Sequence, residues 1–214
     1  MPKNIRINDA IASDEWLKEV KNVYVSGGVI GFPTDTFYGL GVDPLDSSAI
    51  EKIFKIKSRD KNKPILLLIG EKEQLSSIVK EVSPIAETLM EFFWPGPLTL
   101  LFEAKESLPQ SLLGNGNTVG VRFPKSELVL QLLRKIGSPI TATSANISGK
   151  EDCRSGQELF ATIGKQLDLV IDGGEAPGGK VSTIIDSTFF PPKLIREGAL
   201  ERAEIEAVLN ISLD

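Results

Sequence analysis

Short apolar runs alternate with amphipathic segments along this chain, and that alternation limits its fold more than any other feature of the sequence. The apolar runs predict buried strands at residues 29–32, 65–69, 98–102, 118–122, 139–142, 169–171, 183–186 and 194–196. This pattern is typical of an α/β domain. Two stretches, 98–122 and 183–196, bring strands together with no helix between them, so we expect a mixed sheet with antiparallel as well as parallel pairs.

Helices are expected in the segments between these strands. They should run from Trp16 to the Gly27-Gly28 pair, from Ser48 into the lysine-rich stretch 55–63, from Pro84 to Trp94, over 127–136, after Ser155, and over about 201–209. Ser48 with Glu51 and Ser155 with Glu158 have the spacing of capping boxes, and Ser83-Pro84 is typical of a helix start.

The 214 residues contain no internal repeat or low-complexity linker, so we expect one domain over 1–214, with a core at about 10–200 and a terminal helix at about 201–210. Residues 1–16 lack the apolar core of a signal peptide, and no segment approaches the roughly 20 apolar residues of a membrane helix. Cys153 is the only cysteine. A cytoplasmic protein without a membrane partner is therefore expected.

The chain contains no histidine, which excludes Ser-His-Asp and Cys-His catalysis and histidine-bound zinc or iron. A single cysteine also excludes thiolate metal clusters. Catalysis would have to rely on carboxylates, Lys, Arg, hydroxyls, amides and backbone groups, with Mg²⁺ on oxygen ligands. The net charge of −5 argues against a broad nucleic-acid surface but leaves room for a local basic groove.

The segment Phe32–Gly41 follows a buried strand and combines hydroxyls, a carboxylate and glycines. The carboxyl ends of strands in open α/β sheets are common binding places for small polar ligands. The same residue types are also ordinary turn formers. Both interpretations stay open at this point.

Six cations lie within twelve residues, at Lys52, Lys55, Lys57, Arg59, Lys61 and Lys63. Such a cluster suits a polyanion such as a triphosphate or an RNA backbone. Cations at a helix C-terminus also complement the helix dipole, which would explain two or three of the six. No Walker loop is present.

Small hydroxyl residues fill Thr141–Gly149, directly after a predicted strand. Their backbone N–H groups could form an anion nest, or Ser144 and Asn146 could simply cap a turn. Arg122 and Arg196 lie in apolar strand contexts, where a buried guanidinium needs an anion from a side chain or a ligand.

Taken together, these segments resemble the YrdC/TsaC family, the L-threonylcarbamoyladenylate synthases. The resemblance runs from about residue 23 to 200. It is carried by the motifs at 33–40, 57–59, 94–99, 121–124, 144–149, 182–186 and 196–198. It implies an α/β fold with an open, twisted, mixed parallel and antiparallel sheet, flanked by helices, with a positively charged concave groove.

The resemblance also implies a nucleotidyltransferase that converts L-threonine, bicarbonate and ATP into threonylcarbamoyl-AMP and pyrophosphate for the t6A37 modification of tRNA. Its catalytic residues would be Lys57, Arg59, Ser144 and Asn146, the first two holding phosphates and the last two fixing their orientation. Its substrate-binding residues would be Thr34, Lys63, Thr118, Arg122, Thr143, Arg154, Ser182 and Arg196. Arg122 and Ser182 would bind threonine, and Arg196, Thr118 and Arg154 would face the nucleotide.

Mg²⁺ is expected to arrive with ATP, with no metal site in the protein itself. The expected partners are a TsaD-type transferase complex and tRNA. Alternatives are a YciO-like or carbamoyl-adenylate-forming sibling, and a nonenzymatic protein that binds tRNA or double-stranded RNA. The chain departs from the family pattern at Asp60 and Lys63, and at Lys125-Ser126, where many members have histidine. We expect the chemistry to tolerate this, because it needs positioning and charge neutralisation more than a proton shuttle.

Overall fold

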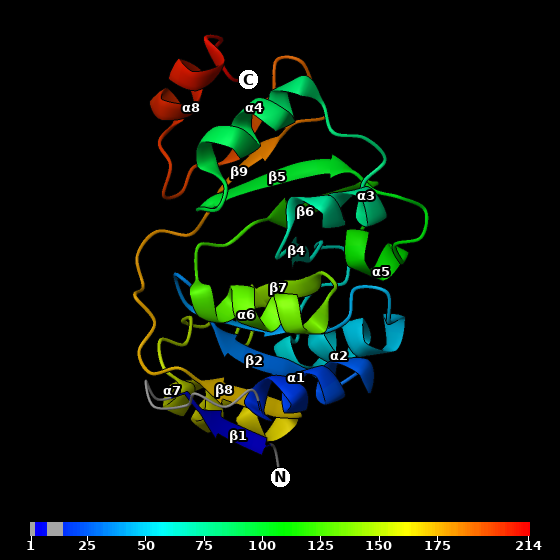
Figure 1. The fold of residues 1–214 in the computed structure, drawn as a ribbon, viewed down its shortest axis with the longest axis vertical. Coiled ribbons are helices and arrows are strands. Elements are labelled where there is room, and N and C mark those ends of the chain that lie inside the picture. The colour runs from blue at the N-terminus through cyan, green and yellow to red at the C-terminus, as the bar shows by residue number, and fades with distance from the viewer. Residues whose placement is uncertain (1–2, 8–14) are drawn as a thin grey trace.

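The computed structural model describes residues 3–7 and 15–214, and its ten strands form one mixed sheet (Figure 1). The start of the predicted core near residue 10 and most of the N-terminal segment therefore lie outside the described residues. The strand order is β1-β8-β2-β3-β7-β4-β6-β5-β9-β10. Four neighbouring pairs, β1-β8, β2-β8, β4-β6 and β5-β9, are parallel and the other five are antiparallel. The predicted mixed sheet is confirmed.

The strands are β1 (Lys3–Arg6), β2 (Ile30–Pro33), β3 (Tyr38–Gly41), β4 (Leu66–Leu68), β5 (Leu98–Glu103), β6 (Thr118–Arg122), β7 (Ile140–Ser144), β8 (Leu169–Asp172), β9 (Thr183–Asp186) and β10 (Lys193–Arg196). The α-helices are α1 (Glu15–Val25), α2 (Ser47–Lys57), α3 (Leu75–Ile78), α4 (Pro84–Phe93), α5 (Gln110–Leu113), α6 (Glu127–Ile136), α7 (Gly156–Thr162) and α8 (Arg202–Leu209). All the predicted strands and longer helices are present.

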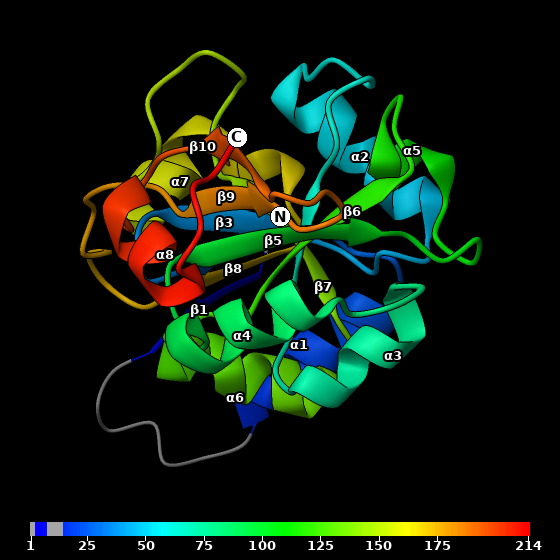
Figure 2. The ribbon, with the colours of Figure 1, turned by 90° about the horizontal axis from the view of Figure 1, so that it is seen from above.

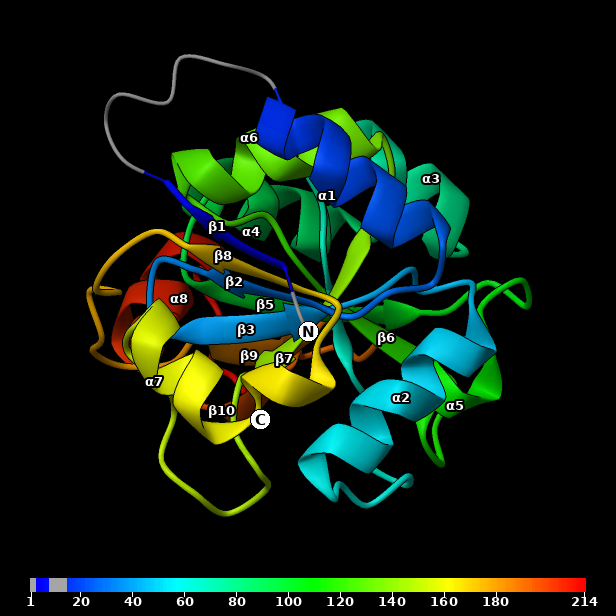
Figure 3. The same cartoon turned by 90° about the horizontal axis from the view of Figure 1, so that it is seen from below.

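Helices flank the sheet on both sides. Viewed from above and from below, α1, α4 and α6 lie on one side of the molecule and α2, α5 and α7 on the other (Figures 2 and 3). One apolar cluster joins α1 and α6 to β2 and β8 through residues such as Val20, Phe32 and Leu132. A larger cluster packs α2 and α4 against strands that include β3, β4, β5, β6 and β9. No helix in residues 3–7 and 15–214 combines the length and the apolar character needed to cross a bilayer.

Two strands and two short helices were not predicted. Strand β3 has the sequence Tyr-Gly-Leu-Gly, in which glycine hides the alternation of apolar side chains. The glycine at position 41 is required by packing, since a Cβ there would lie 2.6 Å from the Thr141 carbonyl oxygen. Strand β1 is short and largely exposed. The expectation of no helix within 98–122 is wrong, because the single turn α5 lies between β5 and β6.

The start of α2 also differs from the prediction. Asp46, not Ser48, is the N-cap: its carboxylate accepts hydrogen bonds from the backbone N–H groups of Ser48 and Ala49, at 2.8 and 3.1 Å. These hydrogen bonds, with one from the Ser48 hydroxyl, lower the pKa of Asp46. The helix ends at Lys57, because Ser58 adopts a left-handed conformation. The lysine-rich stretch beyond it forms a turn and not a longer helix.

We predict that Asp46→Ala lowers the free energy of unfolding by about 1–2 kcal/mol, the usual cost of losing a helix N-cap. Ser48→Ala, which removes one hydroxyl contact to the same carboxylate, should cost less than half as much. The two variants are compared by urea denaturation. The advantage of wild type over Asp46→Ala should be complete above about pH 4 and disappear as acid protonates the carboxylate. Equal losses of unfolding free energy in both variants would mean that Asp46 is not the dominant cap.

Candidate active site

One row of side chains across five strands forms the floor of a cavity of about 370 Å³. Cross-strand pairing aligns Arg196 of β10, Ile184 of β9, Thr99 of β5, Arg122 of β6 and Leu68 of β4. Residues directly opposite one another on neighbouring strands project to the same face of a sheet. The register of the sheet therefore places two guanidinium groups and a hydroxyl in one concave surface.

The turn between β2 and β3 forms a wall of this cavity through Thr34, Asp35, Thr36 and Phe37. The Thr34 hydroxyl stabilises the turn: it donates to the Phe37 carbonyl oxygen at 2.7 Å and accepts from the Thr36 N–H at 3.1 Å. Thr34 thus forms the turn, as one of the two interpretations of this segment expected. The same turn also lines the cavity. The other wall includes Thr143 and Ser144 at the end of β7.

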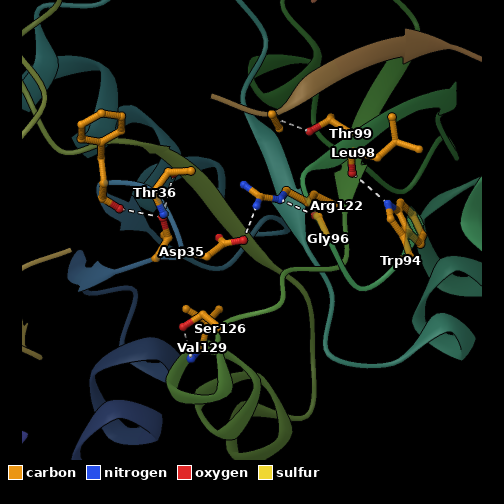
Figure 4. A network of polar contacts seen from close by, with 12 residues as sticks. Asp35, Thr36, Trp94, Gly96, Leu98, Thr99, Arg122, Ser126 and Val129 are labelled. Atoms are coloured by element: carbon orange, nitrogen blue, oxygen red, sulfur yellow. Dashed lines mark hydrogen bonds and ion pairs between the residues drawn. The ribbon is translucent and has the colours of Figure 1, made fainter. Parts of the chain in front are cut away.

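Arg122 is held from both sides, although only 6% of its surface is exposed. Its Nε donates to the Gly96 carbonyl oxygen at 2.9 Å, and its Nη2 donates to Asp35 Oδ2 at 2.5 Å. Figure 4 shows the guanidinium reaching between these two partners. Burial lowers the pKa of Arg122, and the Asp35 carboxylate opposes that shift. The buried cation thus obtains its anion from a side chain, which was one of the two predicted outcomes.

The Trp94–Leu98 segment supports this arrangement. The Trp94 indole N–H donates to the Leu98 carbonyl oxygen at 2.8 Å (Figure 4). The Gly96 N–H donates to the Phe123 carbonyl oxygen at 2.8 Å. A Cβ at Gly96 would lie 2.4 Å from the Phe93 carbonyl oxygen. Only glycine fits there, so this motif serves to present a backbone oxygen to Arg122.

Ser182 and Arg196 contact each other at the other end of the floor. Arg196 donates through Nε and Nη2 to the Ser182 carbonyl oxygen, at 3.1 and 2.8 Å. The Ser182 hydroxyl pairs with the Thr99 hydroxyl at 2.9 Å. Burial lowers the pKa of Arg196. The group predicted to bind threonine and the group predicted to face the nucleotide are therefore immediate neighbours.

A second cavity of about 170 Å³ is lined by Lys57, Arg59, Asp60, Lys63, Ser144, Asn146, Ser148 and Gly149. Arg59 and Ser144 line both cavities, so the two spaces meet at these residues. Arg59 Nη2 donates to the Pro64 carbonyl oxygen at 2.9 Å, and its buried Nε finds no partner among residues 3–7 and 15–214. Arg59 therefore keeps donors for a ligand at the junction.

Lys57 lines the smaller cavity, and its ammonium group is hydrogen-bonded to the segment that follows β7. Its Nζ donates to the Ser144 carbonyl oxygen, to the Asn146 carbonyl oxygen at 2.9 Å, and to Asn146 Oδ1 at 2.7 Å. These three acceptors use all three protons of the ammonium group. These hydrogen bonds form a latch that ties the end of α2 to the 144–149 loop, and the phosphate contact of Lys57 stays a prediction.

Asn146 completes the latch. Its Oδ1 also accepts from the Ser144 hydroxyl at 2.8 Å, and its Nδ2 donates to the Lys150 carbonyl oxygen and Asp152 Oδ1, at 2.6 and 2.9 Å. Burial and the neighbouring Arg59 lower the pKa of Lys57 to about 8, so the ammonium form prevails at neutral pH. The latch is therefore charged and fully hydrogen-bonded under ordinary conditions.

Three backbone N–H groups of the 144–149 loop are paired within the protein, and the anion nest stays one of the two predicted alternatives. The N–H groups of Ala145, Asn146 and Ser148 donate to the carbonyl oxygens of Tyr38, Ser144 and Lys57 respectively. Backbone donors that are already paired offer little to an anion. The loop instead contributes the Ser144 side chain to the cavity junction.

The six clustered cations separate into two groups. Lys57, Arg59 and Lys63 line the smaller cavity. Lys52 donates to the Gly27 carbonyl oxygen at 2.7 Å, Lys61 pairs with Glu51 at 2.5 Å, and Lys55 lies on the exposed surface of α2. Lys55 and Lys57 occupy the last turn of α2, as the helix-dipole interpretation expects, and the polyanion interpretation stays a prediction for the cations of the cavity.

Two predicted site residues lie outside both cavity linings. Thr118 is opposite Glu103 at the start of β6, four residues from Arg122. Arg154 lies with its guanidinium carbon 6.0 Å from the centre of the Phe37 ring. Conversely, Asp35 and Thr99 line the cavity although the prediction omitted them. Both belong to motifs recognised in the sequence, at 33–40 and 94–99. The position of Asp35 in a turn after a strand, and of Thr99 in a strand, could have indicated that they line the site.

More cations than carboxylates line the two cavities. The cations are Lys57, Arg59, Lys63, Arg122 and Arg196, and the carboxylates are Asp35, Asp60 and Asp152. The positive character of the groove nevertheless stays a prediction, because the Asp35 carboxylate offsets the charge of Arg122. Within the described part of the chain, no group of three or more Asp, Glu, Cys or His side chains is placed to hold a metal ion.

The Sua5/YciO/YrdC family model, described as telomere recombination, matches residues 22–198. A protein of Pyrococcus abyssi named threonylcarbamoyl-AMP synthase is 40% identical over 207 residues, which cover 96% of this chain and 61% of that protein. The chain thus spans less than two thirds of this relative's length.

Two solved structures are similar over nearly the whole chain. The crystal structure of P. abyssi Sua5 complexed with L-threonine has a TM-score of 0.91 and 37% identity, covering 100% of this chain and 62% of that one. The crystal structure of E. coli YciO has a TM-score of 0.84 and 30% identity, covering 94% of this chain and 98% of that one. The predicted open, mixed sheet flanked by helices is confirmed by both.

We predict that Lys57→Met lowers the free energy of unfolding by about 2–5 kcal/mol, because three buried oxygens lose a charged donor. Arg59→Ala, which loses one bond to a backbone carbonyl, should cost about 1 kcal/mol or less. Urea denaturation of both variants measures the difference. Similar small losses would mean that the Lys57 hydrogen bonds do not hold the 144–149 loop.

Proposed function

This chain belongs to the Sua5/YciO/YrdC family, and from that premise we propose that it is an L-threonylcarbamoyladenylate synthase. The observation that carries the proposal is the pair of joined cavities: one holds Arg122 and Asp35, which suit an amino acid, and the other holds cations suited to phosphates. The name of the P. abyssi relative and the L-threonine complex of P. abyssi Sua5 support the same assignment.

The reaction has two parts. The threonine amine and bicarbonate condense to a carbamate and release water. A carbamate oxygen then attacks the α-phosphorus of ATP, the bond to the β-phosphate oxygen breaks, and pyrophosphate leaves. Negative charge builds on the phosphoryl oxygens and the leaving group, so fixed positive groups lower the barrier and no imidazole is required.

Each side chain at the junction has a distinct task in this proposal. Arg59 and Lys63 bind phosphate oxygens, because both line the smaller cavity and Arg59 retains donors. Lys57 and Asn146 hold the loop that positions Ser144 at the junction. Lys57, Asn146 and Ser144 therefore set the shape of the site, whereas Arg59 supplies charge.

The larger cavity binds the amino acid and the rest of the nucleotide. Arg122 and Ser182 face threonine, with Thr34 shaping the turn beside them and Thr143 on the opposite wall. Arg196 faces the nucleotide from its contact with Ser182. Thr118 and Arg154 would contact the nucleotide only at the margin of the cavity. Mg²⁺ would enter with the ATP substrate and supply positive charge at its phosphates.

Cytoplasmic location, contact with tRNA and transfer to a TsaD-type complex are parts of the same proposal. One alternative has a specific observation in its favour. E. coli YciO matches this chain over almost the full length of both, so a YciO-like sibling with another substrate is the second candidate. The two candidates differ in whether L-threonine is required for turnover.

The deciding experiment measures pyrophosphate release from ATP with Mg²⁺ and bicarbonate, with and without L-threonine. Serine and carbamoyl phosphate replace threonine in parallel reactions. Release that depends on L-threonine is the expected result. Folded protein that releases no pyrophosphate with threonine would overturn the synthase assignment and favour the sibling.

We predict that Arg59→Ala and Arg122→Ala separate the two substrates. Arg59→Ala should lower kcat/KM for ATP by roughly 100-fold or more, because a charged phosphate contact is lost at the transition state. Arg122→Ala should raise the KM for threonine more than the KM for ATP. Steady-state kinetics in both substrates give the comparison. An equal effect of Arg122→Ala on both KM values would assign that residue a structural role.

A further inference from the structure

The Asp35 carboxylate is only half used by the protein. Its Oδ2 accepts the 2.5 Å hydrogen bond from Arg122 Nη2. Its Oδ1 is buried and has no hydrogen-bond partner anywhere in residues 3–7 and 15–214. A buried, unpaired carboxylate oxygen is costly, and native proteins seldom retain one without a reason.

The turn does not need this carboxylate. Aspartate in a turn usually accepts a hydrogen bond from a nearby backbone N–H. Here the Thr34 hydroxyl takes that role by accepting from the Thr36 N–H. Asp35 is thereby left to face the cavity, and Figure 4 shows it directed toward Arg122.

Arg122 also keeps donors in reserve. Its Nε and Nη2 contact Gly96 and Asp35, while no hydrogen bond joins its Nη1 to any described residue. Asp35 Oδ1 and Arg122 Nη1 are thus an acceptor and a donor of one ion pair that no described residue uses. Since the two charges cancel, the pair favours a ligand that itself carries adjacent positive and negative groups over a simple anion.

From this geometry we infer that Asp35 binds the ammonium group of an α-amino acid while Arg122 binds its carboxylate, an inference that rests on the proposed function. Apolar neighbours such as Leu68, Pro124 and Ile184 line the same cavity and lower the local dielectric, which strengthens both contacts. After carbamate formation the nitrogen retains one N–H, which Asp35 can still accept. Asp35 is therefore a positioning residue that orients the nitrogen within the cavity.

The test compares two ligands that differ at the ammonium group. Titration calorimetry in bicarbonate-free buffer measures binding of L-threonine and of 3-hydroxybutanoate, which has the same carboxylate and hydroxyl but no amine. Asp35→Asn should weaken threonine binding about 10- to 100-fold and change 3-hydroxybutanoate binding less than about 2-fold. Glu51→Gln, in an exposed ion pair of the same length with Lys61, is the matched control and should change neither.

A parallel loss for both ligands in Asp35→Asn would overturn the inference, because it would mean that Asp35 only orients Arg122. No loss for either ligand would overturn it as well. The wild-type protein supplies an arm that needs no variant: 3-hydroxybutanoate should bind at least about 10-fold more weakly than L-threonine, and equal affinities would contradict the assignment.

The binding readout does not depend on turnover, so the two proposals fail separately. Threonine binding that requires Asp35 in a protein that releases no pyrophosphate would retain the inference and reject the synthase. Threonine-dependent pyrophosphate release that Asp35→Asn leaves unchanged, with an unchanged KM for threonine, would retain the synthase and reject the inference.

Discussion

Two buried cations organise this site, because a charge removed from water must find oxygen acceptors in the protein. Lys57 finds three acceptors in the 144–149 loop, and Arg122 finds the Gly96 carbonyl oxygen and the Asp35 carboxylate. Each cation therefore joins segments that lie far apart in the chain. Lys57 fixes the end of α2 to the loop after β7, and Arg122 of β6 is fixed to the turn between β2 and β3. Both contacts lie beside the two cavities.

This difference in hydrogen bonding is consistent with the adenylate chemistry proposed above for a chain without histidine. The groups with the most completely satisfied hydrogen bonds, Lys57 and Asn146, build the walls. The groups with spare hydrogen-bonding capacity, Arg59 and Asp35, lie at the surfaces of the cavities. Preorganised charge stabilises a phosphoryl-transfer transition state without proton transfer by the protein. The contrast between satisfied and unsatisfied polar groups thus separates scaffold from ligand contacts.

Much of this architecture follows from local patterns. Leu98–Phe102 and Thr118–Arg122 are apolar runs whose predicted bounds nearly match β5 and β6, and Ser126 and Ser155 cap α6 and α7 as hydroxyl residues commonly do. One failure occurred where a tertiary neighbour decides: β3 has the composition of a glycine-rich turn, but it pairs with β7. The other failure was local, because the Asp46 carboxylate, two residues before Ser48, accepts from two N–H groups and makes Asp46 the N-cap.

The sequence by itself determined the α/β class, most helices and strands, the motifs that gather at the site and the exclusion of histidine chemistry, since these depend on residue type and short-range periodicity. Tertiary structure decided which polar groups are hydrogen-bonded within the protein and which have no partner there. Lys57 meets Asn146 across 89 residues and Arg122 meets Asp35 across 87. Such pairings depend on strand register and burial. No local pattern encodes that Lys57 is fully hydrogen-bonded to the protein while the nearby Arg59 keeps an unpaired Nε.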